Sequence, residues 1–158
     1  MFVYYDFPSF SDGVLDLRLA QKLPAEPDRG YVPAYIYYMY EPGQNEVIGY
    51  IDLRIGDNEN LLYGGHIGYR VIEQHRGHGY AGRACRLVVP LALAHGMEML
   101  RITCNPDNIA SRRTIEKLGA RLVGIVALPP HNEMYLLGER EKCIFEWDLT
   151  PFKSSGNH

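Results

Sequence analysis

The order of apolar and polar residues predicts that the first half of the chain is built mainly from strands. Residues Val14–Ala20 alternate between apolar and polar side chains, which is the period of a half-buried strand. Further strands are predicted at Ala34–Tyr40, which is rich in tyrosine, and at Val47–Ile55 and Leu61–Val71. The segment 22–33 holds three prolines and a glycine and is therefore predicted to be a loop.

The second half of the chain is predicted to contain two helices. Tyr80–His95 is apolar almost all round from residue 87 to residue 94, which predicts a deeply buried helix that ends at Gly96. Pro90 lies inside it and is expected to kink it, because proline has no N–H to donate to the Arg86 carbonyl. Residues 109–118 predict a second helix, capped by Asp107 or Asn108 and ended by Gly119. The remaining strands are predicted at Leu100–Cys104, Arg121–Leu128 and Lys142–Leu149.

Length and pattern together predict one domain of the α/β (α+β) class. The chain has 158 residues, of which 46% are apolar, enough for one hydrophobic core and too few for two large ones. We assign residues 1–152 to this domain and predict a disordered tail at 153–158.

Charge and cysteine content exclude several classes of function. A net charge of −3 and a pI near 6.1 argue against nucleic-acid binding, which usually needs a basic surface. The cysteines are three in number and widely spaced, as expected of reduced thiols in a cytoplasmic protein. The histidines are scattered, so no metal site is predicted. The N-terminus lacks the pattern of a secretory signal, and no apolar run is long enough to cross a membrane.

A glycine-dense turn at residues 77–82 carries the main chemical signal. It reads Gly77-His78-Gly79-Tyr80-Ala81-Gly82 and runs directly into the first predicted helix. The free N–H groups at a helix start bind anions, and glycines let a phosphate approach the backbone closely. Three arginines crowd the same turn, where the helix dipole favours acids, and this placement predicts a polyanionic ligand. They are Arg76, Arg83 and Arg86.

The same turn also matches the dinucleotide-binding pattern G-x-G-x-x-G. That pattern should open an early strand–turn–helix unit and be followed about 20 residues later by an acid at the end of the next strand. The only acid near that distance is Glu98, which precedes the next strand rather than ending it. The dinucleotide alternative is therefore disfavoured.

Read as Arg76-x-x-Gly79-x-Ala81, the turn resembles the pyrophosphate loop of the GCN5-related N-acetyltransferase (GNAT) family. The segment Asn105-Pro106-Asp107-Asn108-Ile109-Ala110-Ser111 and the closing Glu116-Lys117-Leu118-Gly119 follow in the order typical of that family. The resemblance covers residues 64–126. It implies a mixed, mostly antiparallel sheet with two main helices, which opens between the fourth and fifth predicted strands to admit acetyl-CoA.

The resemblance also implies which residues hold acetyl-CoA. The oxyanion and the pantetheine arm would meet the strand edge at Val71 or Ile72. The cosubstrate would further contact Asn105, Asn108 and Ser111, and the residues of the loop, which are Arg76, Gly77, His78, Gly79, Tyr80, Ala81, Gly82 and Arg83. No metal is implied.

Two departures from the family pattern concern the acceptor and the acid. Only residues 21–33 stand where relatives carry one or two N-terminal helices, so the acceptor wall is expected to come from the N-terminal aromatic residues (Tyr4, Tyr5, Phe7 and Phe10) and from loop 129–140. Ile115 stands where relatives often have a tyrosine that protonates the departing thiolate. The acid–base candidates are Tyr135, Glu73 and Asp52.

We therefore expect transfer of an acetyl group from acetyl-CoA to an amine by direct attack. The alternative is a module that binds acyl-CoA without catalysis. The acceptor is expected to be a small-molecule or peptide amine, with neither a nucleic acid nor a membrane as partner. A homodimer is compatible with the sequence.

Overall fold

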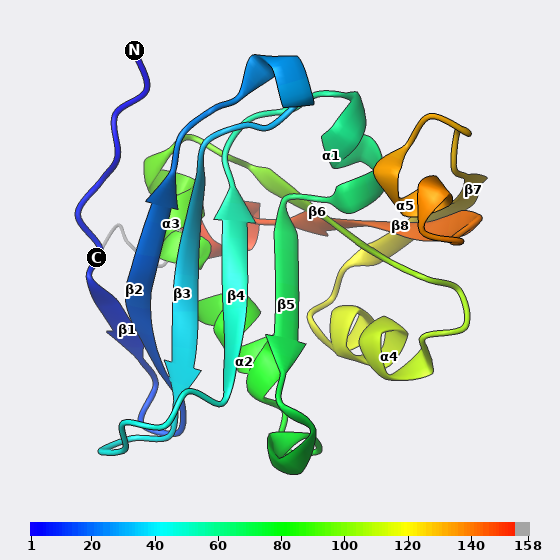
Figure 1. Ribbon diagram of the computed structural model, residues 1–158. Coiled ribbons are helices and arrows are strands. Elements are labelled where there is room, and N and C mark those ends of the chain that lie inside the picture. Colours follow the sequence, from blue (N-terminus) through cyan, green and yellow to red (C-terminus); the bar gives the residue numbers. More distant parts are fainter. Residues whose placement is uncertain (154–158) are drawn as a thin grey trace.

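One eight-stranded sheet runs through the computed structural model, which describes residues 1–153 (Figure 1). Its strand order is β1-β2-β3-β4-β5-β6-β8-β7, and every neighbouring pair is antiparallel except β5 and β6. The strands are β1 (Ser9–Ser11), β2 (Asp16–Leu23), β3 (Ala34–Tyr40), β4 (Gly49–Arg54), β5 (Ile67–Val71), β6 (Met99–Cys104), β7 (Arg121–Ala127) and β8 (Glu141–Asp148). The helices are α1 (Glu59–Gly64), α2 (Tyr80–Leu87), α3 (Val89–Ala94), α4 (Ile109–Lys117), α5 (Glu133–Leu136) and α6 (Thr150–Lys153).

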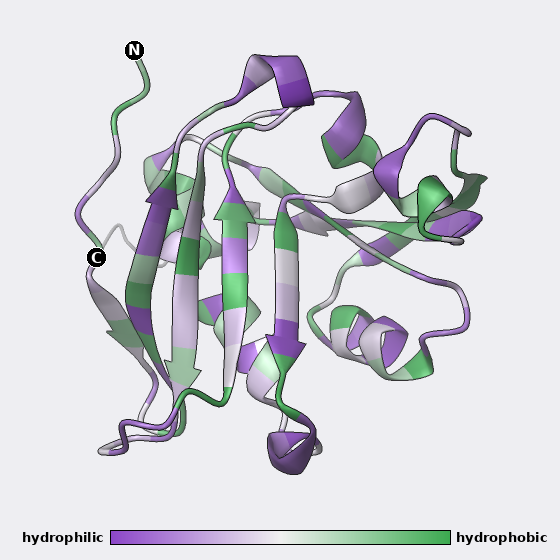
Figure 2. Ribbon diagram, in the orientation of Figure 1, coloured by the Kyte–Doolittle hydropathy of each residue, from purple (hydrophilic) through white to green (hydrophobic). Residues whose placement is uncertain are grey.

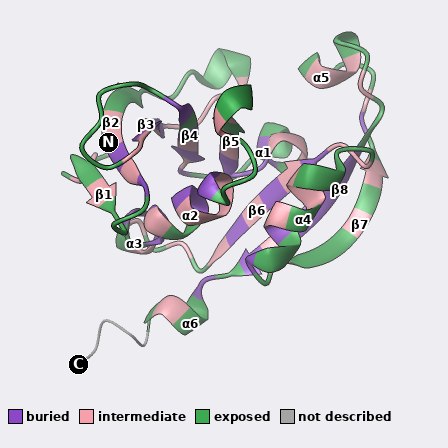
Figure 3. Cartoon of the chain, turned by 90° about the horizontal axis from the view of Figure 1, so that it is seen from below, coloured by how far each residue is buried: buried purple, intermediate pink, exposed green. Residues whose placement is uncertain are grey.

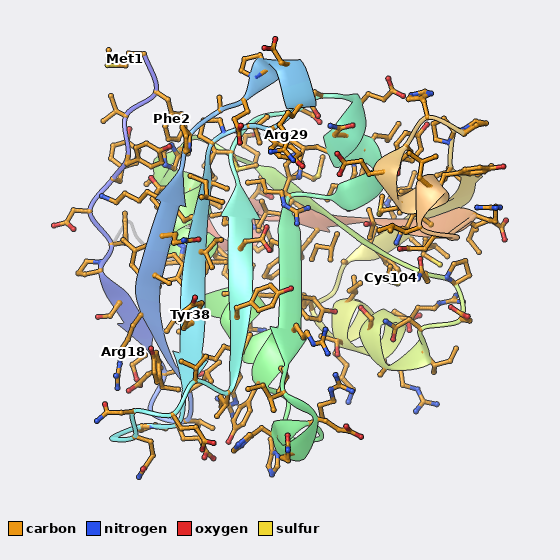
Figure 4. All side chains as sticks on the ribbon, viewed as in Figure 1. Met1, Phe2, Arg18, Arg29, Tyr38 and Cys104 are labelled. Carbon is orange, nitrogen blue, oxygen red and sulfur yellow. The ribbon has the colours of Figure 1, made fainter. Side chains whose placement is uncertain are left out.

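Within residues 1–153, helices cover only one face of the first half of the sheet. In Figure 1, α2 and α3 lie behind β2–β5, and no helix stands in front of these strands. Alternate residues of β3 and β4 face the covered side and are fully buried, as the banded colouring of the strands in Figure 2 reflects. These core residues include Tyr35, Tyr37, Met39, Ile51 and Leu53. Tyr38 stands on the opposite face and keeps 39% of its surface exposed (Figure 4).

The uncovered face follows from the short connection between β2 and β3. Residues 24–33 form only a 3-10 turn at Pro27–Arg29, which is too little chain for the helices expected of relatives. This confirms the prediction of a mixed, mostly antiparallel sheet with a reduced N-terminal helical region.

Two predicted elements were wrong in their extent. Residues 61–64 belong to α1 rather than to a strand, because the side chain of Asn58 accepts a hydrogen bond from the Leu61 N–H (3.1 Å) and starts a helix there. The predicted helix Tyr80–His95 is divided into α2 and α3 at Val88, and Pro90 lies in the first turn of α3. Proline is well suited to that position, so it begins a new helix instead of kinking a long one. Of the predicted tail, Lys153 ends α6, and 154–158 lie outside the described residues.

The sheet opens between β5 and β6, as predicted. A single register pair, Ile67↔Ile102, joins these parallel strands in the described chain. Just before it, the His66 N–H donates to the Arg101 carbonyl (2.7 Å), and the Arg101 N–H donates to His66 Nδ1 (2.7 Å). The strands therefore meet at one end and diverge toward the other, and Figure 3 shows α2 and α4 on either side of that opening.

The imidazole of His66 is held in its neutral form at this junction. Nδ1 accepts a hydrogen bond, so the proton sits on Nε2, which donates to the Gly56 carbonyl (3.1 Å). His66 is 3% exposed, and burial, with Arg101 nearby, lowers its pKa below 6.5.

Folding stability should therefore fall as the pH drops below 6.5. The unfolded chain protonates His66 first, so the stabilisation is complete above that pH and is lost toward the lowered pKa of the folded state. H66Q should lower the thermal midpoint at pH 7.5 and show a smaller further drop between pH 7.5 and 5.5 than the wild type. Burial also lowers the pKa of His95, so part of the pH dependence should remain.

H131Q is the control, since the His131 side chain is 72% exposed. A wild-type pH dependence in H66Q would contradict this account of the junction.

Candidate functional site

A groove of about 720 Å³ occupies the opening between β5 and α4. Its floor and walls come from β5, from Tyr50 of β4, from the loop after β5, from the first turn of α2 and from one side of α4 along its length. Four basic residues line it, and none of its lining residues within the described chain is acidic. The four are Arg70, Arg76, Arg113 and Lys117. On a chain with a net charge of −3, this concentration of cations indicates a polyanionic ligand.

The glycine turn forms the end of this groove. Gly77 (φ 87°) and Gly79 (φ 73°) adopt left-handed backbone conformations, and Gly79 caps the N-terminus of α2. A Cβ built on either residue would meet no atom within 4 Å, so open space adjoins the backbone there. The Arg83 N–H is the first to bond back into the helix, to the Gly79 carbonyl (3.2 Å), which leaves the preceding N–H groups of α2 available to an anion.

Most of the predicted cosubstrate residues line the groove, but five do not. Those that do are Val71, Arg76, Gly77, Gly79, Tyr80, Ala81, Asn108 and Ser111. Arg83 instead pairs with Asp12 (2.9 Å), and Asn105 accepts a hydrogen bond from Lys142 (2.7 Å). Ile72, His78 and Gly82 also lie outside the groove lining.

The edge of β5 presents backbone groups to the groove. Its hydrogen-bonded pairs with β4 alternate, and the Ile72 N–H donates to the Ile48 carbonyl (2.8 Å). The N–H groups of Tyr69 and Val71 therefore point away from β4, toward the opening. Of the two backbone donors predicted from the sequence, only that of Val71 faces the groove.

The sequence interpretation missed several groove residues. Arg113 and Lys117 lie one turn apart on α4, a spacing that places both on one face of a helix and could have identified them. Arg70 alternates to the uncovered face of β5, opposite Tyr50. Tyr69 reaches from β5 to α4, where its hydroxyl lies 2.7 Å from Ser111 Oγ.

A second cavity, of about 520 Å³, lies on the uncovered face of the sheet. The segment 23–36, the end of β4, α1 and residues 132–134 form its walls. Three acids, Glu26, Asp52 and Glu133, line it with one base, Arg54. Apolar side chains make up much of the remaining wall. Its charge is thus opposite to that of the groove.

Asp52 is the predicted acid–base residue that lies in a cavity. Arg54 Nε donates to its Oδ2 (2.7 Å), and the same guanidinium donates to the carbonyls of Gly64 and Gly65. Burial raises the pKa of Asp52, and Arg54 partly opposes this rise. Gly68 on β5 is the register partner of Asp52, and a Cβ on Gly68 would come within 2.6 Å of Asp52 Oδ1.

Neither of the other two acid–base candidates lines the groove or the second cavity. Glu73 is exposed in the turn after β5, and its carbonyl accepts the Arg76 N–H. Tyr135 lies in α5 with Arg140 stacked 3.9 Å from its ring centre. The expected acceptor wall is only half present, because loop 129–140 contributes but the N-terminal aromatic residues pack near His95 and β3.

Sequence and structure comparisons place the chain in a known family. A sheet opened between two parallel strands, with a glycine cradle at the wide end, defines an acetyltransferase fold of the GCN5-related class. Residues 11–121 match the family model described as an acetyltransferase (GNAT) domain. The chain therefore belongs to the GNAT family. No curated protein matches it by sequence.

Solved structures agree on the fold at low sequence identity. A probable GNAT acetyltransferase from Chromobacterium violaceum has a TM-score of 0.68 at 12% identity, over 96% of this chain and 91% of that one. The ribosomal-protein-S5-alanine acetyltransferase from Vibrio fischeri has a TM-score of 0.66 at 14% identity, over 90% and 97%.

The microcin C7 self-immunity acetyltransferase MccE, solved with acetyl-CoA and AMP, has a TM-score of 0.57 at 21% identity, over 73% of this chain. The match spans 61% of the MccE chain. Within residues 1–153, no helix has the length and apolar character needed to cross a membrane.

Replacing Gly68 should destabilise the protein by displacing the Asp52–Arg54 pair. G68A places a methyl group within 2.7 Å of both side chains, and overpacking of this kind costs about 1–3 kcal/mol. The free energy of unfolding in urea measures the loss. G124A is the matched control, because a Cβ at Gly124 in β7 meets nothing within 4 Å. Equal stabilities of the two variants would contradict the close packing at Gly68.

Proposed function

We propose that the protein is an N-acetyltransferase that transfers an acetyl group from acetyl-CoA to an amine. One observation carries the proposal: a cationic groove with a glycine cradle lies at the opening of the sheet, close to an acidic cavity that contains the partly buried carboxylate of Asp52. The groove suits a cosubstrate with several phosphates. The acidic cavity suits an acceptor that arrives as a cation.

The residues of the groove fit CoA. Arg76 and the N–H groups at the start of α2 would hold its pyrophosphate, with Arg113 and Lys117 facing them from α4. The Val71 N–H would donate to a carbonyl of the pantetheine arm, while the Val71 carbonyl already accepts a hydrogen bond from Arg76 Nε (2.9 Å). The Tyr69 N–H, the next donor along this edge, would then be placed to stabilise the oxyanion of the reaction. When bound, acetyl-CoA supplies the activated acetyl thioester.

The acidic cavity fits an amine with an apolar body. Arg54 is already engaged by Asp52 and two carbonyls, so the carboxylates of Glu26 and Glu133 dominate the field that an incoming ligand meets. An alkylammonium is only about one part in a thousand neutral at pH 7, so it needs a base. Asp52 would take this proton. A peptide N-terminus and a small-molecule amine both satisfy these requirements, and a homodimer remains a prediction.

Calorimetric titration with CoA and acetyl-CoA tests the cosubstrate site, with NADH as the control ligand. The wild type should bind both CoA forms and not NADH. G79V should lose at least tenfold in CoA affinity, because its side chain enters the space that the pyrophosphate needs.

The matched control for backbone strain is G96V. Gly96 has a similar left-handed conformation (φ 78°, against 73° at Gly79) and the same open surroundings, but it lies after α3 and outside the groove. It should lose stability and keep CoA affinity. Wild-type affinity in a folded G79V protein would refute the cradle.

D52N should lower kcat by about 10²–10⁴ while leaving CoA affinity nearly unchanged, since Asp52 lies in the other cavity. In the wild type, kcat should fall on acidification, because protonation removes the base. The pKa of Asp52 is raised above 3.8, so this fall in kcat should be centred above pH 3.8. The pH profile of acetyl transfer to a panel of amines measures both effects. CoA binding without turnover of any amine would favour the alternative of a binding module.

A further inference from the structure

If the proposed function is right, the departing thiolate needs a proton donor. Few side chains of the groove carry a proton that they could give. The hydroxyl of Tyr80 is held by Glu41 (2.9 Å), and His75 lies near Glu41 and Glu46 at the loop end. Lys117 is in the last turn of α4. Tyr50 is 41% exposed on the uncovered face of the sheet. Tyr80, His75 and Lys117 lie away from the point where the strands part, and Tyr50, although level with that point, stands on the face of the sheet opposite to α2.

We propose that Tyr69 is the proton donor, with its hydroxyl fixed by Ser111. Tyr69 is two residues beyond Ile67, where β5 last pairs with β6, so its ring stands where the sheet begins to open. Its hydroxyl spans the opening to α4 and lies 2.7 Å from Ser111 Oγ. Ser111 is itself held in the first turn of α4, where its N–H donates to Asn108 Oδ1 (3.1 Å).

The thioester would reach this same end of the groove. The pyrophosphate belongs at the glycine cradle, at the opposite end of β5, and a pantetheine arm paired with the β5 edge runs from there toward Tyr69. The sulfur atom at the end of the arm therefore arrives next to the phenol, between β5 and α4.

Ile115 explains why the proton has to come from β5. It lies one turn after Ser111 on the same face of α4 and is completely buried, so it brings no titratable group to the groove. A helical side chain leans over the turn that precedes it, so the surface which residue 115 could cover lies near Ser111. The Tyr69 hydroxyl occupies that region from the opposite wall.

The proton balance of the step is complete without any further reactant. The neutral amine forms a C–N bond to the thioester carbon, and the C–S bond then breaks. The sulfur takes the proton of the Tyr69 hydroxyl and leaves as the thiol. The phenolate recovers a proton from the nitrogen, directly or through the Ser111 hydroxyl, and the nitrogen ends as a neutral amide. Burial raises the pKa of Tyr69 to about 12, so the hydroxyl carries its proton at neutral pH.

Y69F tests the assignment through both catalysis and binding. With any amine that the wild type acetylates, kcat should fall about a hundredfold. The binding test compares CoA with desulfo-CoA, which lacks the sulfur. The wild type should bind CoA more tightly than desulfo-CoA. In Y69F the ratio of the two affinities should fall about fivefold, which is the equivalent of one hydrogen bond. A purely structural role of Tyr69 would weaken both ligands equally.

Y38F is the control, because Tyr38 lies on the uncovered face and lines neither cavity. It should match the wild type in both tests. A kcat within twofold of the wild type in Y69F, or an unchanged preference for CoA over desulfo-CoA, would overturn the role of Tyr69 and leave the proposed function standing. A wild type that binds no CoA would instead overturn the proposed function itself. If CoA binds but no amine is acetylated, the binding comparison alone decides.

Discussion

The candidate site depends on β5 and β6 being joined at one end only. His66 and Arg101 exchange two hydrogen bonds there, and the carbonyl of Tyr63 accepts a third from the Thr103 hydroxyl (2.8 Å). Beyond this junction the strands separate, and the N–H groups of Tyr69 and Val71 point into the opening, while the Val71 carbonyl accepts a hydrogen bond from Arg76 Nε. An edge of this kind is usually a liability in a sheet, because it pairs with whatever strand approaches it. Here α2 and α4 flank this edge (Figure 3).

The second constraint is the short connection between β2 and β3. Because this segment is too short to cover the sheet with helices (Figure 1), polar residues of β4 remain on an open face. The acidic cavity forms on this face, beside the segment 23–36 and α1. Asp52 can lie over β5 only because the residue beneath it is Gly68. The carboxylate is thus buried by local packing rather than by a covering domain.

The parts of the fold that sequence could predict are those fixed by local patterns. Ala34–Tyr40 and the helix ended by Gly119 depend on periodicity and capping, and the glycine loop depends on backbone conformations that few other residues adopt. The helix α1 was missed because the side-chain hydrogen bond of Asn58 that starts it outweighed the strand pattern of the apolar residues that follow. Pairings such as Arg83 with Asp12 and Tyr69 with Ser111 join residues 71 and 42 positions apart, and nothing in the local pattern encodes them.

The opposite charges of the two cavities also bear on how products would leave. On the proposed function, the acceptor enters the acidic cavity as a cation and becomes a neutral amide. The carboxylates of the cavity therefore attract the cationic substrate but no longer attract the neutral product. CoA keeps every phosphate after the transfer, so the arginines and the lysine of the groove hold it as firmly as before. This asymmetry favours an order in which the acetylated product departs first and CoA leaves last.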